Sequence, residues 1–293
     1  MRTLTILAFV CVACSPTFAQ TMYSVRETDD TLVKIDISDP AAPIISDVGP
    51  LGVRFQFGGM TFGPGSELFM ADGLHPPSLY TVNTKTGEAT LVGPTGLDDL
   101  DAIAWDTSTR TMYGTQFVQG QALVTIDPAT GEAMIVNPMM DVGIGGLTYN
   151  ADTDQLVGSH NGPGDLYEID RETGDLTLLF DGPFVNDSGL TYDPVNNFYW
   201  GIDWSGVLFY YDIAKGLQRT DLLTGLAPHD GLAWIPAPCP WDLDNSGIVG
   251  ATDLLSLLVN WGKCPGCPAD FDGNGVVGAT DLLALLVNWG PCP

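Results

Sequence analysis

Positive charge is scarce in this 293-residue chain: ten lysines and arginines stand against 36 aspartates and glutamates, and the formal net charge at pH 7 is −26. This charge argues against nucleic acids and anionic lipid surfaces as partners, because both are bound through basic patches. Histidine is also rare, with three in the whole chain, so a histidine-rich metal centre is not expected. The sequence contains no HExxH motif and no nucleophile elbow.

Long apolar runs are missing except at the N-terminus. There, an apolar stretch over residues 4–14 follows Arg2 and is succeeded by a small residue, Ala19. This order predicts a signal peptide over residues 1–19, and therefore a secreted protein that is extracellular or attached to the cell surface. A lipoprotein signal at Cys14 is the alternative. No other apolar run approaches the length that a membrane-spanning helix needs.

Cysteine is absent between this leader and residue 239. Two pairs of cysteines then follow at the spacing of a 28-residue repeat: Cys239, Cys264, Cys267 and Cys292. In a secreted module, four cysteines predict two disulfides. Two pairings respect the repeat, 239–264 with 267–292 or 239–292 with 264–267, and the spacing does not choose between them. A redox or zinc motif at 264–267 is the alternative, but no histidine partner surrounds it.

The C-terminal region contains the same segment twice. Each copy is a twelve-residue acidic loop, at residues 242–253 and 270–281, that runs into an apolar helix. An EF-type loop offers calcium oxygen ligands from positions 1, 3, 5, 7, 9 and 12 and needs glycine at position 6, where Gly247 and Gly275 stand. The predicted ligands of two Ca²⁺ ions, with a backbone carbonyl at position 7, are Asp242, Asp244, Ser246, Ile248, Asp253, Asp270, Asp272, Asn274, Val276 and Asp281.

Two Asp/Gly-rich turns that merely cap helices are the alternative, because these residues favour turns in any protein. Against this alternative, the requirements of the calcium loop are met twice in register. Two features differ from an ordinary EF-hand: position 12 is aspartate in both copies, and a proline-rich segment stands in place of an incoming helix. In these features residues 239–292 resemble the dockerin domain. The resemblance implies a calcium-folded module that binds a cohesin-like module, often in polysaccharide-degrading assemblies. It also implies partner contacts at loop positions 10 and 11, which are Ala251, Thr252, Ala279 and Thr280.

Both predicted helices of this module are apolar almost all round, over residues 254–261 and 282–289. Such a helix is either buried or shared between a core and a partner. We therefore expect part of each leucine-rich surface to face the other repeat and part to face a partner. The identical pairs at positions 10 and 11 imply a module that can bind in two orientations.

Residues 21–235 repeat less strictly. One strand-like line begins at Leu32, Leu79, Leu123, Leu166 and Leu208, at intervals of 47, 44, 43 and 42 residues. A second begins at Gly59, Ala102, Gly146, Gly189 and Gly231. Two further short apolar segments accompany them in each unit, separated by turn residues, so four strands per unit are expected. Five such units predict a five-bladed β-propeller.

The fifth unit ends near Trp234 without its following strand, and the segment from Met22 to Val25 supplies a matching one. We expect this N-terminal strand to complete the last blade and close the ring, which removes exposed sheet edges. A β-sandwich is the alternative. The repeat texture resembles secreted propellers of the YVTN/NHL type. The expected organisation is mainly β, with a signal peptide at residues 1–19, a propeller at 20–235, a Pro-rich linker at 236–240 and a small α-helical, calcium-binding, dockerin-like domain at 241–293, to which Cys239 is tied.

Polar residues gather where the predicted inner strands begin, at the mouth of the expected central channel. Lactonase and some hydrolase propellers place a metal or an acid–base pair at this location, and the catalytic candidates here are Asp101, Asp187, His229 and Asp230. The alternative is that these aspartates accept hydrogen bonds from local N–H groups and only cap strands. Trp204 is a candidate for stacking on a sugar, because it lies on a loop and does not recur between units.

Two functions remain open. In the first, the propeller is a binding or scaffold module that the dockerin-like domain anchors to a cohesin-bearing surface or complex, with carbohydrate as a candidate ligand. In the second, it is a hydrolase or lyase acting on a polysaccharide or a lactone. A carboxylate pair at glycosidase spacing would favour the second function. No motif specific to such chemistry is present, so we expect a binding module rather than an enzyme.

Overall fold

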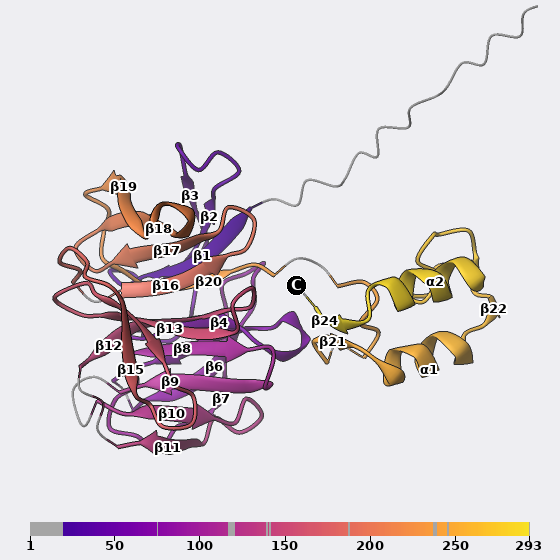
Figure 1. Ribbon diagram of the computed structural model, residues 1–293, viewed down its shortest axis with the longest axis horizontal. Coiled ribbons are helices and arrows are strands. Elements are labelled where there is room, and N and C mark those ends of the chain that lie inside the picture. Colours follow the sequence, from indigo (N-terminus) through magenta and orange to yellow (C-terminus); the bar gives the residue numbers. More distant parts are fainter. Residues whose placement is uncertain are drawn as a thin grey trace, which may run out of the picture.

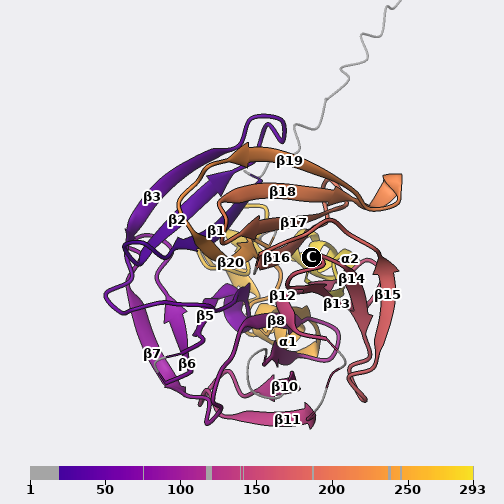
Figure 2. The ribbon, with the colours of Figure 1, turned by 90° about the vertical axis from the view of Figure 1, so that its left-hand side faces the viewer.

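The computed structural model describes residues 20–74, 76–116, 121–138, 140, 142–186, 188–236, 239–244 and 246–292. Five four-stranded antiparallel sheets form a ring, and a small module with two helices follows (Figures 1 and 2). The predicted five-bladed propeller and the mainly β fold are confirmed. The predicted signal peptide lies outside the described residues.

Each blade is one sheet whose four strands are ordered from the centre of the ring to its rim. The first blade is β20 (His229–Trp234), β1 (Thr21–Arg26), β2 (Thr31–Asp36) and β3 (Ile44–Pro50). The second is β4 (Met60–Phe62), β5 (Leu68–Asp72), β6 (Ser78–Val82) and β7 (Ala89–Pro94). The third is β8 (Ala102–Asp106), β9 (Thr111–Thr115), β10 (Leu123–Ile126) and β11 (Ala133–Asn137).

The last two blades follow the same order. The fourth is β12 (Ile144–Asn150), β13 (Gln155–His160), β14 (Leu166–Ile169) and β15 (Leu176–Phe180). The fifth is β16 (Ser188–Asp193), β17 (Phe198–Asp203), β18 (Val207–Asp212) and β19 (Gln218–Thr224). Two short 3₁₀ turns, η1 (Pro64–Ser66) and η2 (Ile213–Lys215), lie between strands. Every strand line predicted from the repeat therefore overlaps a strand, although the line that begins at Gly59 starts one residue before β4.

The two ends of the propeller meet in the first blade. Strand β1 pairs antiparallel with β20, with Met22 opposite Trp234 and Arg26 opposite His229. The register shifts between Ser24 and Val25, which marks a β-bulge. The predicted closure by the N-terminal strand is confirmed, and it joins the two ends of the propeller's sequence through backbone hydrogen bonds.

The apolar core lies between neighbouring blades. Each strand alternates its side chains between the two faces of its sheet, so every blade buries one set against each neighbour. Five clusters of buried side chains result; the one between the first and second blades contains Leu32, Met60 and Met70, and the one between the fifth and first contains Met22, Trp200 and Leu232. Burial of these side chains holds the blades in a ring.

Small residues let the inner strands meet at the axis. A Cβ added to Gly59 would lie 2.4 Å from the backbone nitrogen of Ile103, and one added to Gly189 would lie 2.6 Å from the carbonyl carbon of Gly231. Gly59, Ala102, Gly146, Gly189 and Gly231 line the axis with the apolar residue that follows each, and no water-sized space remains among them. The inner strands thus surround the axis as expected, but at this level they fill it and leave no channel.

Arg171, in the turn after β14, joins the third and fourth blades. Its Nη1 lies 2.6 Å from Asp106 Oδ2, at the end of β8, and 2.9 Å from Asp154 Oδ1, in the turn after β12. Burial raises the pKa of Asp106, but hydrogen bonds from Arg171 and Thr109 outweigh it and leave the pKa below its usual value. Hydrogen bonds from Arg171 and Tyr149 lower the pKa of Asp154 to about 2.

Replacing Arg171 with alanine is expected to cost about 2 kcal/mol at neutral pH, because the fully buried Asp106 loses a charged hydrogen-bond donor. The two depressed carboxylate pKa values stabilise the folded state above pH ~4, and this contribution disappears as the pH falls towards 2. Urea unfolding of wild type and Arg171→Ala between pH 2.5 and 6 measures it. The stability difference should shrink on acidification, and a constant difference would contradict the assignment.

The C-terminal module consists of two equivalent halves. Its elements are β21 (Ile248–Val249), α1 (Ala251–Val259), β22 (Gly262–Lys263), β23 (Val276–Val277), α2 (Ala279–Val287) and β24 (Gly290–Pro291). Strand β21 of the first half pairs with β24 of the second, and β22 of the first pairs with β23 of the second. Each half therefore completes the sheets of the other. In the described part of the chain, no helix has the length and apolar character needed to cross a membrane.

Candidate functional site

Two acidic loops of the C-terminal module each gather three carboxylates. Asp242, Asp244 and Asp253 each place one carboxylate oxygen so that the three atoms lie within 4.8 Å of one another. The equivalent oxygens of Asp270, Asp272 and Asp281 do the same. These aspartates occupy loop positions 1, 3 and 12, so the structure brings together the acidic part of both predicted ligand sets.

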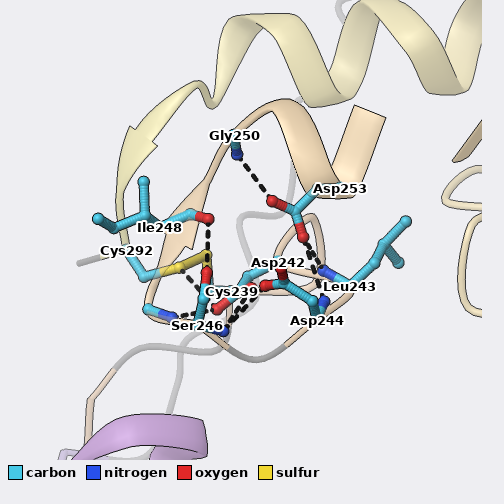
Figure 3. The surroundings of a disulfide bond; sticks show 10 residues. Cys239, Asp242, Leu243, Asp244, Ser246, Ile248, Gly250, Asp253 and Cys292 are labelled. Atoms are coloured by element: carbon cyan, nitrogen blue, oxygen red, sulfur yellow. Dashed lines mark hydrogen bonds between the residues drawn. A yellow bond between two sulfur atoms is a disulfide. The ribbon is translucent and has the colours of Figure 1, made fainter. Parts of the chain in front are cut away.

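Backbone N–H groups hold the first loop in its turn (Figure 3). Asp242 accepts hydrogen bonds from the N–H groups of Ser246 at 3.0 Å and Gly247 at 2.7 Å. Gly247 has a φ of 83°, a conformation that glycine adopts without steric cost. The Ser246 hydroxyl donates to the carbonyl oxygen of Ile248 at 3.1 Å, so the predicted ligands at positions 5 and 7 lie side by side.

The aspartate at position 12 connects each loop to its helix. Asp253 is fully buried and accepts hydrogen bonds from the N–H groups of Leu243 and Gly250, both at 2.7 Å. Asp281 accepts from Phe271 and Gly278, both at 2.8 Å. Burial raises the pKa of Asp281, but its backbone hydrogen bonds outweigh this effect and lower the pKa below its usual value. Asp281 is therefore held as a carboxylate.

The second loop contains a carboxylate oxygen that lacks a donor. Oδ2 of Asp270 accepts from the N–H of Gly275 at 2.8 Å, whereas its Oδ1 is buried and has no hydrogen-bond partner among the described residues. Burying such an oxygen is costly unless a cation or a donor lies beside it. Asn274 Oδ1 accepts from the N–H of Val276 at 2.8 Å, which places both predicted ligands in the same turn. The predicted metal-ligand atoms of both loops are all oxygens, so either loop could hold a hard cation such as Ca²⁺ or Mg²⁺.

Two disulfides tie the module together. Cys239 is bonded to Cys292, and Cys264 to Cys267. This is one of the two pairings that the repeat allowed, and the exchange of strands between halves accounts for it. Strand β24 lies against β21, and the N–H of Cys292 donates to the carbonyl of Gly247 at 2.9 Å, which brings the C-terminal cysteine back to the first loop (Figure 3).

Both helices expose matching apolar side chains. The buried positions Leu257 and Leu285 face the shared core. We define the α1 face as Leu255, Leu258, Val259 and Trp261, and the α2 face as Leu283, Leu286, Val287 and Trp289, all of them exposed. Exposed apolar patches on a small module mark interaction sites. The exposed pairs Ala251–Thr252 and Ala279–Thr280 lie three or four residues before Leu255 and Leu283, and therefore on the same sides of the helices.

Three of the propeller's four catalytic candidates lie on one face of the ring. We call it the loop face; it carries the loops from the second to the third strand of each blade and from each outer strand to the next inner strand. Asp101 precedes β8 there, and His229 and Asp230 begin β20. Asp187 lies outside the described residues. Strand β20 starts at the loop face and ends at the opposite face, where the chain continues to the C-terminal module (Figures 1 and 2).

The side chains of Asp230 and His229 both contact backbone groups. Asp230 accepts hydrogen bonds from the N–H groups of Gly58 at 3.2 Å and Gly231 at 2.7 Å, as the capping alternative predicts. Nδ1 of His229 lies 2.6 Å from the carbonyl oxygen of Ala227. Burial lowers the pKa of His229, so its imidazole is neutral at pH 7. A catalytic role for these residues stays a prediction.

Four carboxylates fix one segment of the loop face. The consecutive N–H groups of residues 55–58 donate in turn to Asp30 at 2.9 Å, Asp72 at 3.1 Å, Glu27 at 3.0 Å and Asp230 at 3.2 Å. These partners come from three loops and strands far apart in the sequence. Reasoning from the sequence missed Glu27 and Asp30, because nothing local distinguishes them from the other acidic residues of the chain.

Trp204 joins this arrangement from the fifth blade. Its Nε1 donates to Glu27 Oε2 at 2.8 Å, and its ring centroid lies 6.3 Å from that of Phe57. Burial raises the pKa of Glu27 above its usual value, against the effect of hydrogen bonds from Phe57 and Trp204. The Trp204 ring is partly exposed, as a stacking platform must be, but its polar edge is already bonded within the protein.

Comparisons with known proteins identify the fold and no family. No protein-family model and no curated protein match the chain. A chain of the crystal structure of a nidogen/laminin complex is 12% identical, with a TM-score of 0.52, over 76% of this chain and 100% of that one. A structural genomics protein of unknown function from Bacteroides thetaiotaomicron VPI-5482 is 14% identical, with a TM-score of 0.50, over 80% of this chain and 67% of that one. These likenesses show the propeller fold alone, and the dockerin resemblance has no support from them.

Proposed function

We propose that residues 241–293 form a calcium-dependent, dockerin-like plug for a cohesin-like module, and that the propeller at residues 20–235 is a binding or scaffold module anchored by it. The observation that carries the proposal is the duplicated oxygen-ligand cluster at the start of two helices with matching exposed apolar faces. Each ion would order one loop and so fix the helix that begins at position 10. One Ca²⁺ per loop is proposed, on the ligands predicted from the sequence.

The proposed organisation places the protein outside the cell. Residues 1–19 would serve as a signal peptide, and residues 236–240 as the linker between propeller and plug. The two disulfides suit an oxidising compartment, and the strongly acidic chain suits a calcium-rich one. Attachment to a polysaccharide-degrading assembly, with carbohydrate as a ligand of the propeller, belongs to the same proposal.

Partner binding would use the α1 and α2 faces together with Ala251, Thr252, Ala279 and Thr280. The two halves carry the same residues at these positions, so either helix could contact the partner in the same way. Strand β20 ends at the face opposite the loop face and the C-terminal module lies on that side, which leaves the loop face free for a ligand while the plug is engaged (Figure 1).

Charged substitutions should separate the two helix faces. Leu255→Asp or Leu283→Asp alone is expected to retain capture, because the other face is intact, whereas the double variant should lose it. Affinity capture from the host's secreted fraction, with and without EDTA and with identification of the captured protein, measures this. Ile44→Asp with Leu91→Asp, on the exposed rim of the propeller, is the matched control. Capture by the double variant at the wild-type level would contradict the proposed surface.

Chelation should act on the plug alone. EDTA is expected to loosen the C-terminal module, and EDTA with a reductant to unfold it, because metal and disulfides both stabilise only the folded form. The β signal of the propeller in far-UV circular dichroism should persist, since the structure describes no disulfide within the ring. Near-UV spectra report on Trp241, Trp261 and Trp289 of the module. No change in them after both treatments would overturn the proposed metal dependence.

A further inference from the structure

The loop face contains a polar cavity of about 390 Å³ beside the segment held by four carboxylates. It is lined by Glu27, Thr28, Asp30, Arg54, Phe55 and Gln56. Its volume is within the range of small-molecule sites, which are typically about 300–1,000 Å³. Two carboxylates, one guanidinium, a hydroxyl and an amide thus share one space.

The opposite charges in this cavity do not neutralise one another. Among the described arginines, Arg26, Arg171 and Arg219 form ion pairs with aspartates, whereas the exposed Arg110 forms none. Arg54 forms none, and no hydrogen bond of its guanidinium occurs in the described part of the chain, although Glu27 and Asp30 line the same cavity. Arg54 is itself exposed, so its guanidinium is open to a ligand in the cavity.

The backbone of the cavity wall is fixed before any ligand arrives. Phe55, Gln56, Phe57 and Gly58 all donate their N–H groups to carboxylates. Phe57 has a φ of 48° and Asp30 a φ of 52°, in the left-handed region that non-glycine residues rarely adopt. Such conformations persist where the surrounding contacts over-determine them, which is common at ligand sites. A pre-formed wall lowers the ordering cost of binding.

We propose that this cavity binds a small dipolar molecule, an α-amino acid with a polar side chain. Its carboxylate would lie against the guanidinium of Arg54, its ammonium against the carboxylates of Asp30 and Glu27, and its side chain against Thr28 and Gln56. A lone anion would meet two carboxylates, and a lone cation would meet the guanidinium. Only a molecule with both charges pairs with every charged group of the lining.

This proposal deepens the binding half of the proposed function and rests on the propeller being a binding module. It involves neither calcium nor the helix faces, so capture by the plug and binding at the cavity can fail separately. A neutral sugar would leave the charges of Arg54 and Asp30 unpaired, and binding of such a sugar is an alternative outcome of the test.

Isothermal titration of the full-length mature chain in calcium-containing buffer tests the proposal. The probes are L-glutamine and its two halves, glutaramate without the ammonium group and 4-aminobutanamide without the carboxylate. Galactose is the neutral-sugar probe. L-Glutamine is expected to bind with 1:1 stoichiometry, and each half at least about tenfold more weakly, because each loses one charge-assisted contact.

Two variants assign the contacts. Arg54→Gln should weaken L-glutamine about tenfold or more and leave 4-aminobutanamide unchanged. Asp30→Asn keeps an acceptor for the N–H of Phe55 and tolerates the left-handed backbone, and it should weaken L-glutamine and 4-aminobutanamide but not glutaramate. Lys85→Gln removes one exposed positive charge from the opposite face and is the matched control, with thermal unfolding confirming the fold of each variant.

The weak end of small-ligand affinities is a Kd of ~1 mM. If L-glutamine gives no saturable heat at concentrations up to 20-fold above this value, the proposal is overturned. Galactose binding in its place would overturn it too, as would glutaramate binding as tightly as L-glutamine. An Arg54→Gln variant that binds like wild type would remove the guanidinium from the site. If Lys85→Gln weakens the binding of L-glutamine as much as Arg54→Gln does, the effect is one of non-specific charge, and it contradicts the assignment.

Discussion

Replacing Asp253 and Asp281 together with alanine is expected to abolish calcium uptake and calcium-dependent capture while leaving the propeller folded. Both residues occupy position 12, where the carboxylate would complete the ligand set of its loop. Removing even an indirect contact to a metal ligand costs about 10–100-fold in affinity, so loss of a direct ligand should cost at least about 100-fold. Calcium titration followed by capture with and without EDTA measures both effects.

The same substitution also has a structural cost that must be separated from the loss of ligand. Asp253 accepts hydrogen bonds from the N–H groups of Leu243, Asp244 and Gly250, and alanine would leave all three without that partner. Each such loss costs about 1–3 kcal/mol where the group is buried. Asp253→Asn with Asp281→Asn keeps an acceptor oxygen but removes the charge, so it should retain more of the fold and still lose calcium.

Asp98→Ala with Asp181→Ala is the control for charge, because both carboxylates are exposed and lie in loops of the propeller. This variant should bind calcium and partner as wild type does. If the position-12 variants capture partner normally and in a calcium-dependent way, the two loops are not the metal sites that matter for docking.

Replacing Gly59 with valine is expected to destabilise the propeller by about 3 kcal/mol or more. A Cβ at Gly59 would lie 2.4 Å from the backbone nitrogen of Ile103 and 2.8 Å from the Cα of Ala102, and neither atom can move without shifting β8. Overpacking typically costs 1–3 kcal/mol, and the upper end or beyond is expected where the clash is with backbone. Because five inner strands share the axis, a shift of β8 would disturb its neighbours.

Chemical unfolding followed by far-UV circular dichroism measures this effect. Thr90→Val introduces the same residue on the exposed outer strand β7 and should change stability by less than about 0.5 kcal/mol. Calcium uptake by the C-terminal module should be the same in both variants. A Gly59→Val protein as stable as wild type would show that the axis has room to spare and that the inner strands are not in close contact.

The blades could be predicted from the sequence because each is a local unit. The recurring lines that begin at Leu32, Leu79 and Leu123 lie in β2, β6 and β10, and the missing strand of the fifth unit pointed to β1. A glycine or alanine begins every predicted inner strand line, and these small residues are what allows the axis to close. The sequence alone does not show this, because it depends on how closely the five strands approach one another. A repeat gives the order of strands and not the distance between them.

The acidic loops were predictable for the same reason of locality. Asp242 and Asp253 are eleven positions apart, and a single tight turn with Gly247 in a left-handed conformation brings them together. The disulfide pattern could not be predicted from the sequence, because both symmetric pairings of the cysteines fit the spacing. Only the pairing of β21 with β24 distinguishes them.

The arrangement around residues 55–58 depends entirely on tertiary structure. Glu27 is 30 positions from Phe57, and Asp230 is 172 positions from Gly58. Trp204 reaches Glu27 across 177 positions. Asp230 was noted because it begins an inner strand, and Trp204 because it does not recur, yet no pattern in the chain links them to each other or to Arg54.

The most direct measurement is calcium titration calorimetry on the full-length mature protein, before and after Asp253→Ala with Asp281→Ala. Two ions taken up per chain, and none by the variant, is the result that follows from two oxygen-lined loops acting as metal sites. No uptake by the wild-type protein at millimolar calcium would contradict the account. Calcium could then not order the loops that fix the two helices and their exposed leucines.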